Sequence, residues 1–201
     1  MRSPSIKSSP RVKSGRQYAA EHSLPAPRDL NSPRDTTRVF RKNPGPTLRH
    51  FVQVRHVRAF VEILPDWTTL SAGLNAILLA PPPRPGVDGF HRPGLVAICA
   101  QPRNPHWVVT DERYVDAHRD LFDRLGVPIE STPDGHALRF TEQTLRAYQL
   151  LHVLLHELGH HHDRMTTRSK REASRGEPFA ELYARSHGDR IWARYFDLFP
   201  D

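Results

Sequence analysis

The segment from Leu145 to His160 constrains the fold of this chain more than any other stretch of its sequence. Apolar residues dominate its first part on all sides of a helical projection, and this pattern predicts a buried helix. His156 and His160 follow in the same run, four residues apart, so a helix places both imidazoles on one face about 6 Å from each other. Because a histidine without a partner is costly to bury, the sequence predicts a common partner for this pair.

His156, Glu157 and His160 together form the pattern His-Glu-X-X-His, which is typical of metal-dependent hydrolases. Both histidines can give an imidazole nitrogen to one Zn²⁺, and Glu157 can take a proton from a water molecule at the remaining coordination position. Thr141, just ahead of Glu142, is the predicted N-cap of this helix. The alternative interpretation is a core helix whose histidines are satisfied by other groups.

A zinc site of this kind needs a third protein ligand. Asp163 and Thr166 stand where the metzincin pattern has a glycine and a third histidine, so that pattern is excluded. Further along, Pro178 fits the first turn of another helix, which places Glu177 and Glu181 one turn apart. One of these carboxylates can bind zinc, while the other holds a ligating histidine by its free ring N–H.

These motifs resemble those of the gluzincins, which are zinc peptidases with His-Glu-X-X-His and a glutamate from a following helix. Residues 177–184 are similar to the third-ligand helix of lethal-factor-type toxin peptidases and related bacterial zincins, and more loosely to that of repressor-cleaving peptidases. The resemblance covers roughly residues 140–190. It implies His156, His160 and Glu177 as metal ligands, Glu157 as the catalytic base and Glu181 as the residue that orients a histidine. Glu181 as the third ligand, with Glu177 near the helix N-cap, remains open because Pro178 restricts the residue before it.

Other polar residues near the motif have more than one interpretation. Tyr183 and His187 are candidate donors to a transition-state oxyanion, or else half-exposed residues of the second helix. We expect His161 and His162 in solvent or at the helix C-terminus, where a positive charge is favourable. His152 lies one turn before His156 and is expected to line a cleft or to bond a core carbonyl.

The remainder of the sequence predicts an α+β fold. Strands are expected at Leu74–Ala80, at Leu95–Ala100, at Trp107–Thr110 and on both sides of the turn signal Thr132–Gly135, with a helix over Glu112–Leu125 capped by Asp111. The resemblance implies a small zincin-like domain with a short β-sheet, an active-site helix and a following third-ligand helix. An extended peptide can add itself to the edge of such a sheet, and Leu95–Ala100 is the expected edge strand.

Charge divides the chain into two parts. Residues 1–46 contain ten Lys/Arg and three Asp/Glu, so they carry the whole net charge of +7. This basic, Pro/Ser-rich segment is expected to be a disordered tail that binds polyanions such as nucleic acid, or a solvated linker without a partner. Residues 47–201 are expected to form the folded domain. A single cysteine, Cys99, and the lack of a long apolar run favour a cytoplasmic protein without a membrane span.

The sequence therefore predicts a zinc-dependent metallopeptidase that hydrolyses peptide or protein substrates. One alternative is a regulatory zincin that cleaves one dedicated partner, such as a DNA-bound protein. Another is a non-catalytic, zinc-stabilised module that binds nucleic acid or protein. The presence of Glu157 argues against the last alternative, because a structural zinc site needs no base and usually has four protein ligands.

Overall fold

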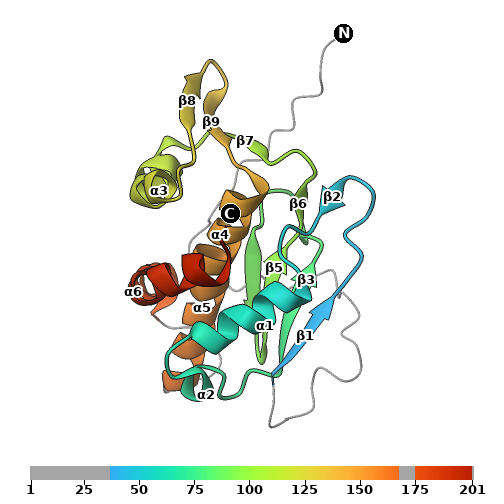
Figure 1. Ribbon diagram of the computed structural model, residues 1–201, viewed down its shortest axis with the longest axis vertical. Helices are drawn as coiled ribbons and strands as arrows, with labels where there is room; N and C mark the ends of the chain where they lie inside the picture. The colour runs from blue at the N-terminus through green and yellow to red at the C-terminus, as the bar shows by residue number, and fades with distance from the viewer. Residues whose placement is uncertain (1–36, 168–174, 201) are drawn as a thin grey trace.

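The apolar runs of the sequence form the centre of a four-stranded sheet. The computed structural model describes residues 37–167 and 175–200, which form a mixed α+β structure (Figure 1). The strands are β1 (Arg38–Arg41), β2 (Leu48–Arg49), β3 (Ala76–Ala80), β4 (Gly89–Arg92), β5 (Leu95–Cys99), β6 (Gln101–Pro102), β7 (His106–Val109), β8 (Ile129–Thr132) and β9 (Gly135–Arg139). The helices are α1 (Val54–Ile63), α2 (Trp67–Leu70), α3 (Glu112–Arg124), α4 (Glu142–Tyr148), the π-helical segment η1 (Gln149–Leu154), α5 (Leu155–Thr166) and α6 (Gly176–Leu198).

The main sheet has the strand order β1-β3-β5-β4. β1, β3 and β5 are parallel, whereas β4 runs antiparallel to β5. One face of the two central strands packs into the main core with the helices, and the other carries a smaller apolar cluster around Leu78, Ala80 and Ala97. Every residue of β3 is buried, as expected of a parallel strand that is covered on both sides.

The prediction that Leu95–Ala100 is an edge strand is wrong, because β5 (Leu95–Cys99) lies between β3 and β4 in the sheet. The edge next to the long helix is β4, for which the sequence predicted no strand. β4 has only four residues, and Phe90 is the only large apolar side chain among them. A strand this short and polar leaves almost no alternation signal, so only its pairing with β5 defines it.

The long helix begins as predicted but is not continuous α-helix. Thr141 caps α4, and its side chain accepts a hydrogen bond from the Thr144 N–H. The π-helical turn η1 then interrupts the α-helical hydrogen bonds just before the His-Glu-X-X-His motif. One-turn π segments are frequent at functional sites, since the extra residue rotates the following side chains. The side-chain amide of Gln149 donates to the Cys99 carbonyl at 2.8 Å, which ties this turn to the end of β5.

A smaller antiparallel sheet has the order β7-β9-β8 and lies near helix α3, and β2 and β6 form a separate antiparallel pair (Figure 1). Asp111 caps α3 as predicted, because its carboxylate accepts a hydrogen bond from the Arg113 N–H. In the described part of the chain, no helix has both the length and the apolar character that crossing a bilayer requires.

The expected start of the folded domain at residue 47 is too late. Residues 1–36 of the expected tail lie outside the described residues, but Arg38–Arg41 form β1 and pair with β3. Val39 packs against the main core, and Phe40 packs against the smaller apolar cluster. The sequence Arg-Val-Phe-Arg is too short and too charged to predict a strand by itself, and β3 supplies the partner that makes it one.

Two truncations test this boundary. Deletion of residues 1–46 removes β1 and exposes one side of β3, whereas deletion of residues 1–36 keeps this strand. Loss of the partly buried Val39 and Phe40 side chains costs about 2 kcal/mol. We expect the longer deletion to melt roughly 5 °C below the shorter one. Equal melting temperatures by circular dichroism would show that β1 does not stabilise the sheet.

Candidate metal centre

The metal-binding candidates lie where α5 and α6 approach each other closely (Figure 1). A Cβ atom on Gly159 would lie only 2.9 Å from the Ala180 Cα and 3.1 Å from the Tyr183 Cβ, so glycine is required at this contact. The approach brings the face of α5 that carries the two motif histidines against the first two turns of α6. Backbone proximity therefore determines which carboxylates can reach the imidazoles.

Asp163 fixes the start of α6. Its buried carboxylate accepts hydrogen bonds from the backbone N–H groups of Arg175 (2.8 Å) and Gly176 (3.0 Å) and from the Arg175 side chain (2.7 Å). A carboxylate at this position satisfies free N–H groups and complements the helix dipole. Asp163 therefore sets the position of Glu177, which follows directly.

Three side chains converge on one point between the two helices. The Nε2 atoms of His156 and His160 are 3.0 Å apart. The carboxylate of Glu177 places one oxygen 3.1 Å from His156 Nε2 and the other 3.5 Å from His160 Nε2. Two imidazole nitrogens and one carboxylate are a donor set that catalytic zinc sites use. These three residues therefore fit a zinc ion that retains an open coordination position.

Glu181 occupies a different place around His156. One of its oxygens lies 3.1 Å from His156 Nδ1, the ring nitrogen that does not face Glu177. The charge of this carboxylate favours the tautomer with the proton on Nδ1, which directs the lone pair of Nε2 toward the common point. The arrangement favours Glu177 as the ligand and Glu181 as the orienting residue.

The charges of this cluster are strongly coupled. Burial opposes the ionisation of Glu177, but its contacts with His156 and His160 outweigh this effect and lower the pKa of Glu177 to about 2. Burial also lowers the pKa of His156, yet Glu177 and Glu181 outweigh it and raise that pKa to about 10. The pocket therefore favours positive charge at the convergence point, which a cation can supply in place of protons.

Glu157 faces the edge of the main sheet. Its side chain is 7% exposed. Burial raises the pKa of Glu157 to about 7, His156 and His160 oppose this shift, and Glu177 and Asp88 add to it. A carboxylate with a pKa near 7 is well matched to accept a proton at neutral pH.

The edge strand β4 makes room for this carboxylate. A Cβ atom on Gly89 would lie 2.8 Å from Glu157 Oε1, 2.7 Å from Val153 Cγ1 and 2.9 Å from the Ala97 carbonyl. His91, two residues along and therefore on the same face of β4, has its ring centroid 6.5 Å from that of His160. Neither Gly89 nor His91 was identified from the sequence, because β4 itself gave no recognisable strand pattern.

The two donor candidates lie away from the convergence point. Tyr183 packs against His162 and His187, with ring centroids 5.4 and 4.0 Å away, and His187 Nδ1 donates to the Tyr183 carbonyl at 3.0 Å. Two residues along a helix rotate a side chain by about 200°, so Tyr183 projects from a different face of α6 than Glu181. The structure brings neither candidate together with His156, His160 and Glu177.

The expectations for the neighbouring histidines change as well. His161 is fully buried, and its Nε2–H donates to the Ala72 carbonyl at 2.9 Å, so it is neither in solvent nor at a helix cap. His162 packs against Phe179 and Tyr183 on α6. His152 contacts the rings of His118, Tyr148 and His156 and lines a cavity, which agrees with one of the two expectations for it. These contacts arise from segments distant in sequence, which helical spacing could not reveal.

Comparisons with protein-family models, with curated proteins and with solved structures found no match for this chain.

Substitution of Gly89 tests the close contact between β4 and Glu157. Gly89→Ala forces the new methyl group against Val153 and Glu157, and overpacking of this kind costs about 1–3 kcal/mol. We expect a lower melting temperature with a zinc content like that of the unaltered protein, because the zinc-ligand candidates are not displaced directly. An unchanged melting temperature would show that β4 lies further from α5 than described.

Substitution of Glu177 and Glu181 tests which of them binds the metal and which orients His156. We expect Glu177→Ala to abolish zinc binding at the His156–His160 site at micromolar zinc, because a direct ligand of that site is lost. Glu181→Ala leaves the three ligands in place and weakens binding roughly 10–100-fold, the usual effect of losing an orienting partner. Equilibrium dialysis with metal analysis measures both, and Glu62→Ala, an exposed position on α1, serves as the control. Stronger loss at the His156–His160 site in Glu181→Ala than in Glu177→Ala would reverse the assignment.

Proposed function

We propose that this chain is a gluzincin-like zinc metallopeptidase that hydrolyses peptide bonds. The observation that carries the proposal is the convergence of His156 Nε2, His160 Nε2 and both oxygens of Glu177, with the buried carboxylate of Glu157 on the adjoining turn. The resemblance in motif to the gluzincins points to the same four residues. The mixed α+β fold is compatible with a zincin-like domain.

His156, His160 and Glu177 would hold the zinc ion. When bound, zinc supplies a Lewis acid that activates water and polarises the carbonyl oxygen of the scissile bond. Glu157 accepts the proton of the attacking water and can then pass it to the leaving nitrogen. Glu181 holds His156 in the tautomer that leaves Nε2 free for the metal.

The edge strand β4 is the proposed support for the substrate. β4 is an outer strand of the main sheet and packs against α5, so this edge of the sheet lies beside the motif helix. An extended peptide can pair with such an edge through main-chain hydrogen bonds. This placement brings a scissile carbonyl past Glu157 without requiring a particular side chain.

A structural zinc module is the weaker interpretation. Its ligands would normally number four and would not need a neighbouring carboxylate whose pKa is close to neutral. The alternative of a regulatory peptidase with one dedicated partner, together with polyanion binding by residues 1–46 and a cytoplasmic location, stays a prediction from the sequence.

Replacement of the proposed base tests the mechanism. We expect Glu157→Gln to retain zinc and lose peptide hydrolysis by at least ~10²-fold, because glutamine cannot accept the proton. Unfolded casein is the substrate, zinc is measured in the same samples, and Glu62→Gln on the exposed face of α1 is the matched control. A zinc-replete Glu157→Gln protein with full activity would refute Glu157 as the base.

A further inference from the structure

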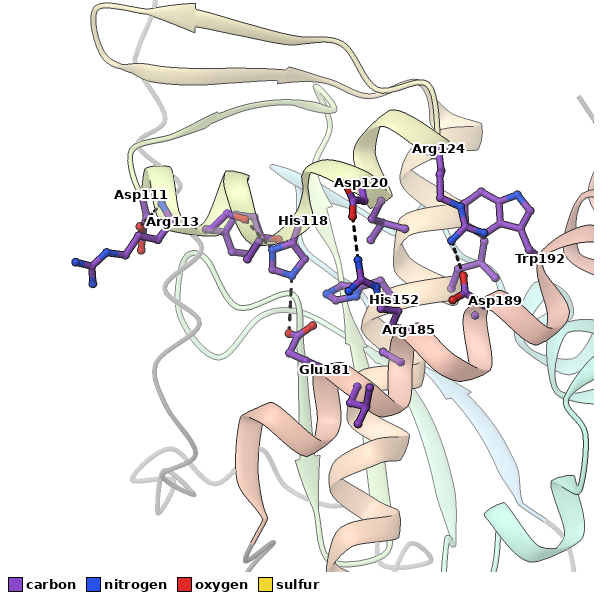
Figure 2. Close-up of a pocket in the computed structure, with 17 residues that line it drawn as sticks. Asp111, Arg113, His118, Asp120, Arg124, His152, Glu181, Arg185, Asp189 and Trp192 are labelled. Carbon is purple, nitrogen blue, oxygen red and sulfur yellow. Dashed lines mark hydrogen bonds and ion pairs between the residues drawn. The ribbon is translucent and has the colours of Figure 1, made fainter.

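A cavity of about 620 Å³ lies between α3, η1 and α6, and Glu181, which also contacts His156, lines it (Figure 2). α3 supplies one wall, and α6 supplies the opposite wall. Two ion pairs join these walls, from Arg185 to Asp120 and from Arg124 to Asp189. Arg124 also lies over the Trp192 ring, 3.9 Å from its centroid. These contacts hold α3 at a defined distance from α6.

Three potential metal ligands meet at this cavity. They are His118 from α3, His152 from η1 and Glu181 from α6, and their ligand atoms all lie within 4.8 Å of one another. Figure 2 shows His118 and Glu181 directed toward each other from opposite walls. The ring centroids of His118 and His152 are 4.8 Å apart. Three separate elements thus contribute one donor each, as in many metal sites that form only on folding.

One ring nitrogen of His118 is buried without a hydrogen-bond partner among the described residues. Its Nδ1–H donates to the Tyr114 carbonyl at 2.8 Å, so the lone pair of the neutral ring lies on Nε2. This side chain is 8% exposed, and Nε2 has no hydrogen-bond partner among the described residues. Nε2 faces a Glu181 oxygen at 3.8 Å, which is too far for a hydrogen bond.

A lone pair that faces a carboxylate at this distance is unfavourable unless a positive charge lies between them. A proton on Nε2 is one solution and gives an imidazolium–carboxylate pair. A metal ion is the other, and the separation of the atoms suits it better, since an ion bonded to both needs them further apart than a hydrogen bond allows. His152 then supplies the third donor from the inner end of the cavity.

We propose that His118, His152 and Glu181 form a second metal site, which takes a divalent ion of the zinc class. Imidazole and carboxylate donors suit zinc and its neighbours among the transition metals. The cavity provides an entry path and room for water molecules that complete the coordination. The site shares Glu181 with the proposed metal centre, but its existence does not depend on peptidase activity.

Zinc stoichiometry of the full chain tests the proposal. After removal of metal with a chelator, each protein is dialysed against micromolar zinc, and bound zinc is measured by elemental analysis. We expect two equivalents in the unaltered protein, one in His118→Phe, one in Glu177→Ala, and none in the double variant. His118→Phe is chosen because phenylalanine keeps the ring packing against Tyr114 and Phe122 without a nitrogen. His106→Ala, an exposed histidine on β7, is the control and should keep two equivalents.

The outcomes separate this site from the proposed metal centre. One equivalent in the unaltered protein that is abolished by Glu177→Ala and kept in His118→Phe overturns the second site and leaves the first intact. One equivalent that is abolished by His118→Phe and kept in Glu177→Ala supports the second site and refutes the first. If His118→Phe fails to give a cooperative melting transition, His152→Gln is measured in its place and should also lose one equivalent. Two equivalents retained in a folded His118→Phe protein and in His152→Gln would refute the proposal.

Discussion

The close approach of α5 and α6 at Gly159 and Ala180 is the contact on which the candidate site depends. A side chain at residue 159 would separate the helices, and the carboxylate of Glu177 would no longer reach both Nε2 atoms. Asp163 on α5 also fixes the position of Glu177, because its carboxylate accepts hydrogen bonds from the backbone N–H groups at the start of α6. Gly159 and Asp163 both lie within a few residues of His160. The motif helix therefore carries two candidate ligands together with the contacts that position the third.

This packing gives each nitrogen of His156 its own carboxylate. Glu177 faces Nε2 and Glu181 faces Nδ1, both at 3.1 Å. Since the two acids are one helical turn apart on α6, a single helix presents a candidate ligand and the residue that orients the histidine. Glu157, adjacent to His156 in the chain, points instead toward β4, where the absence of a side chain at Gly89 leaves it space. The opposed directions of neighbouring side chains separate the proposed metal ligands from the proposed base.

The sequence predicted the parts of this arrangement that local patterns encode. Thr141 and Asp111 cap their helices as expected, and helical spacing placed His156 and His160 on one face. The sequence could not predict β1 and β4, because four-residue strands with charged or small residues exist only through pairing with β3 and β5. Nor could it predict the π-helical turn, or the meeting of His118 with Glu181. Such contacts depend on the relative positions of whole helices, which no short-range periodicity records.

Glu181 contacts residues of both proposed metal sites. One of its oxygens lies 3.1 Å from His156 Nδ1 on α5 and 3.8 Å from His118 Nε2 on α3. If both proposed sites bind metal, they share this carboxylate, and their occupancies must be coupled. The shared anion attracts both ions, whereas the ions repel each other, so the second ion binds more weakly than it would alone. The donors of the first site lie 3.0–3.5 Å apart, and in the second site His118 Nε2 lies 3.8 Å from the Glu181 oxygen. By thermodynamic linkage, binding of the second ion changes the affinity of the first site by the same factor by which binding of the first ion changes the affinity of the second site.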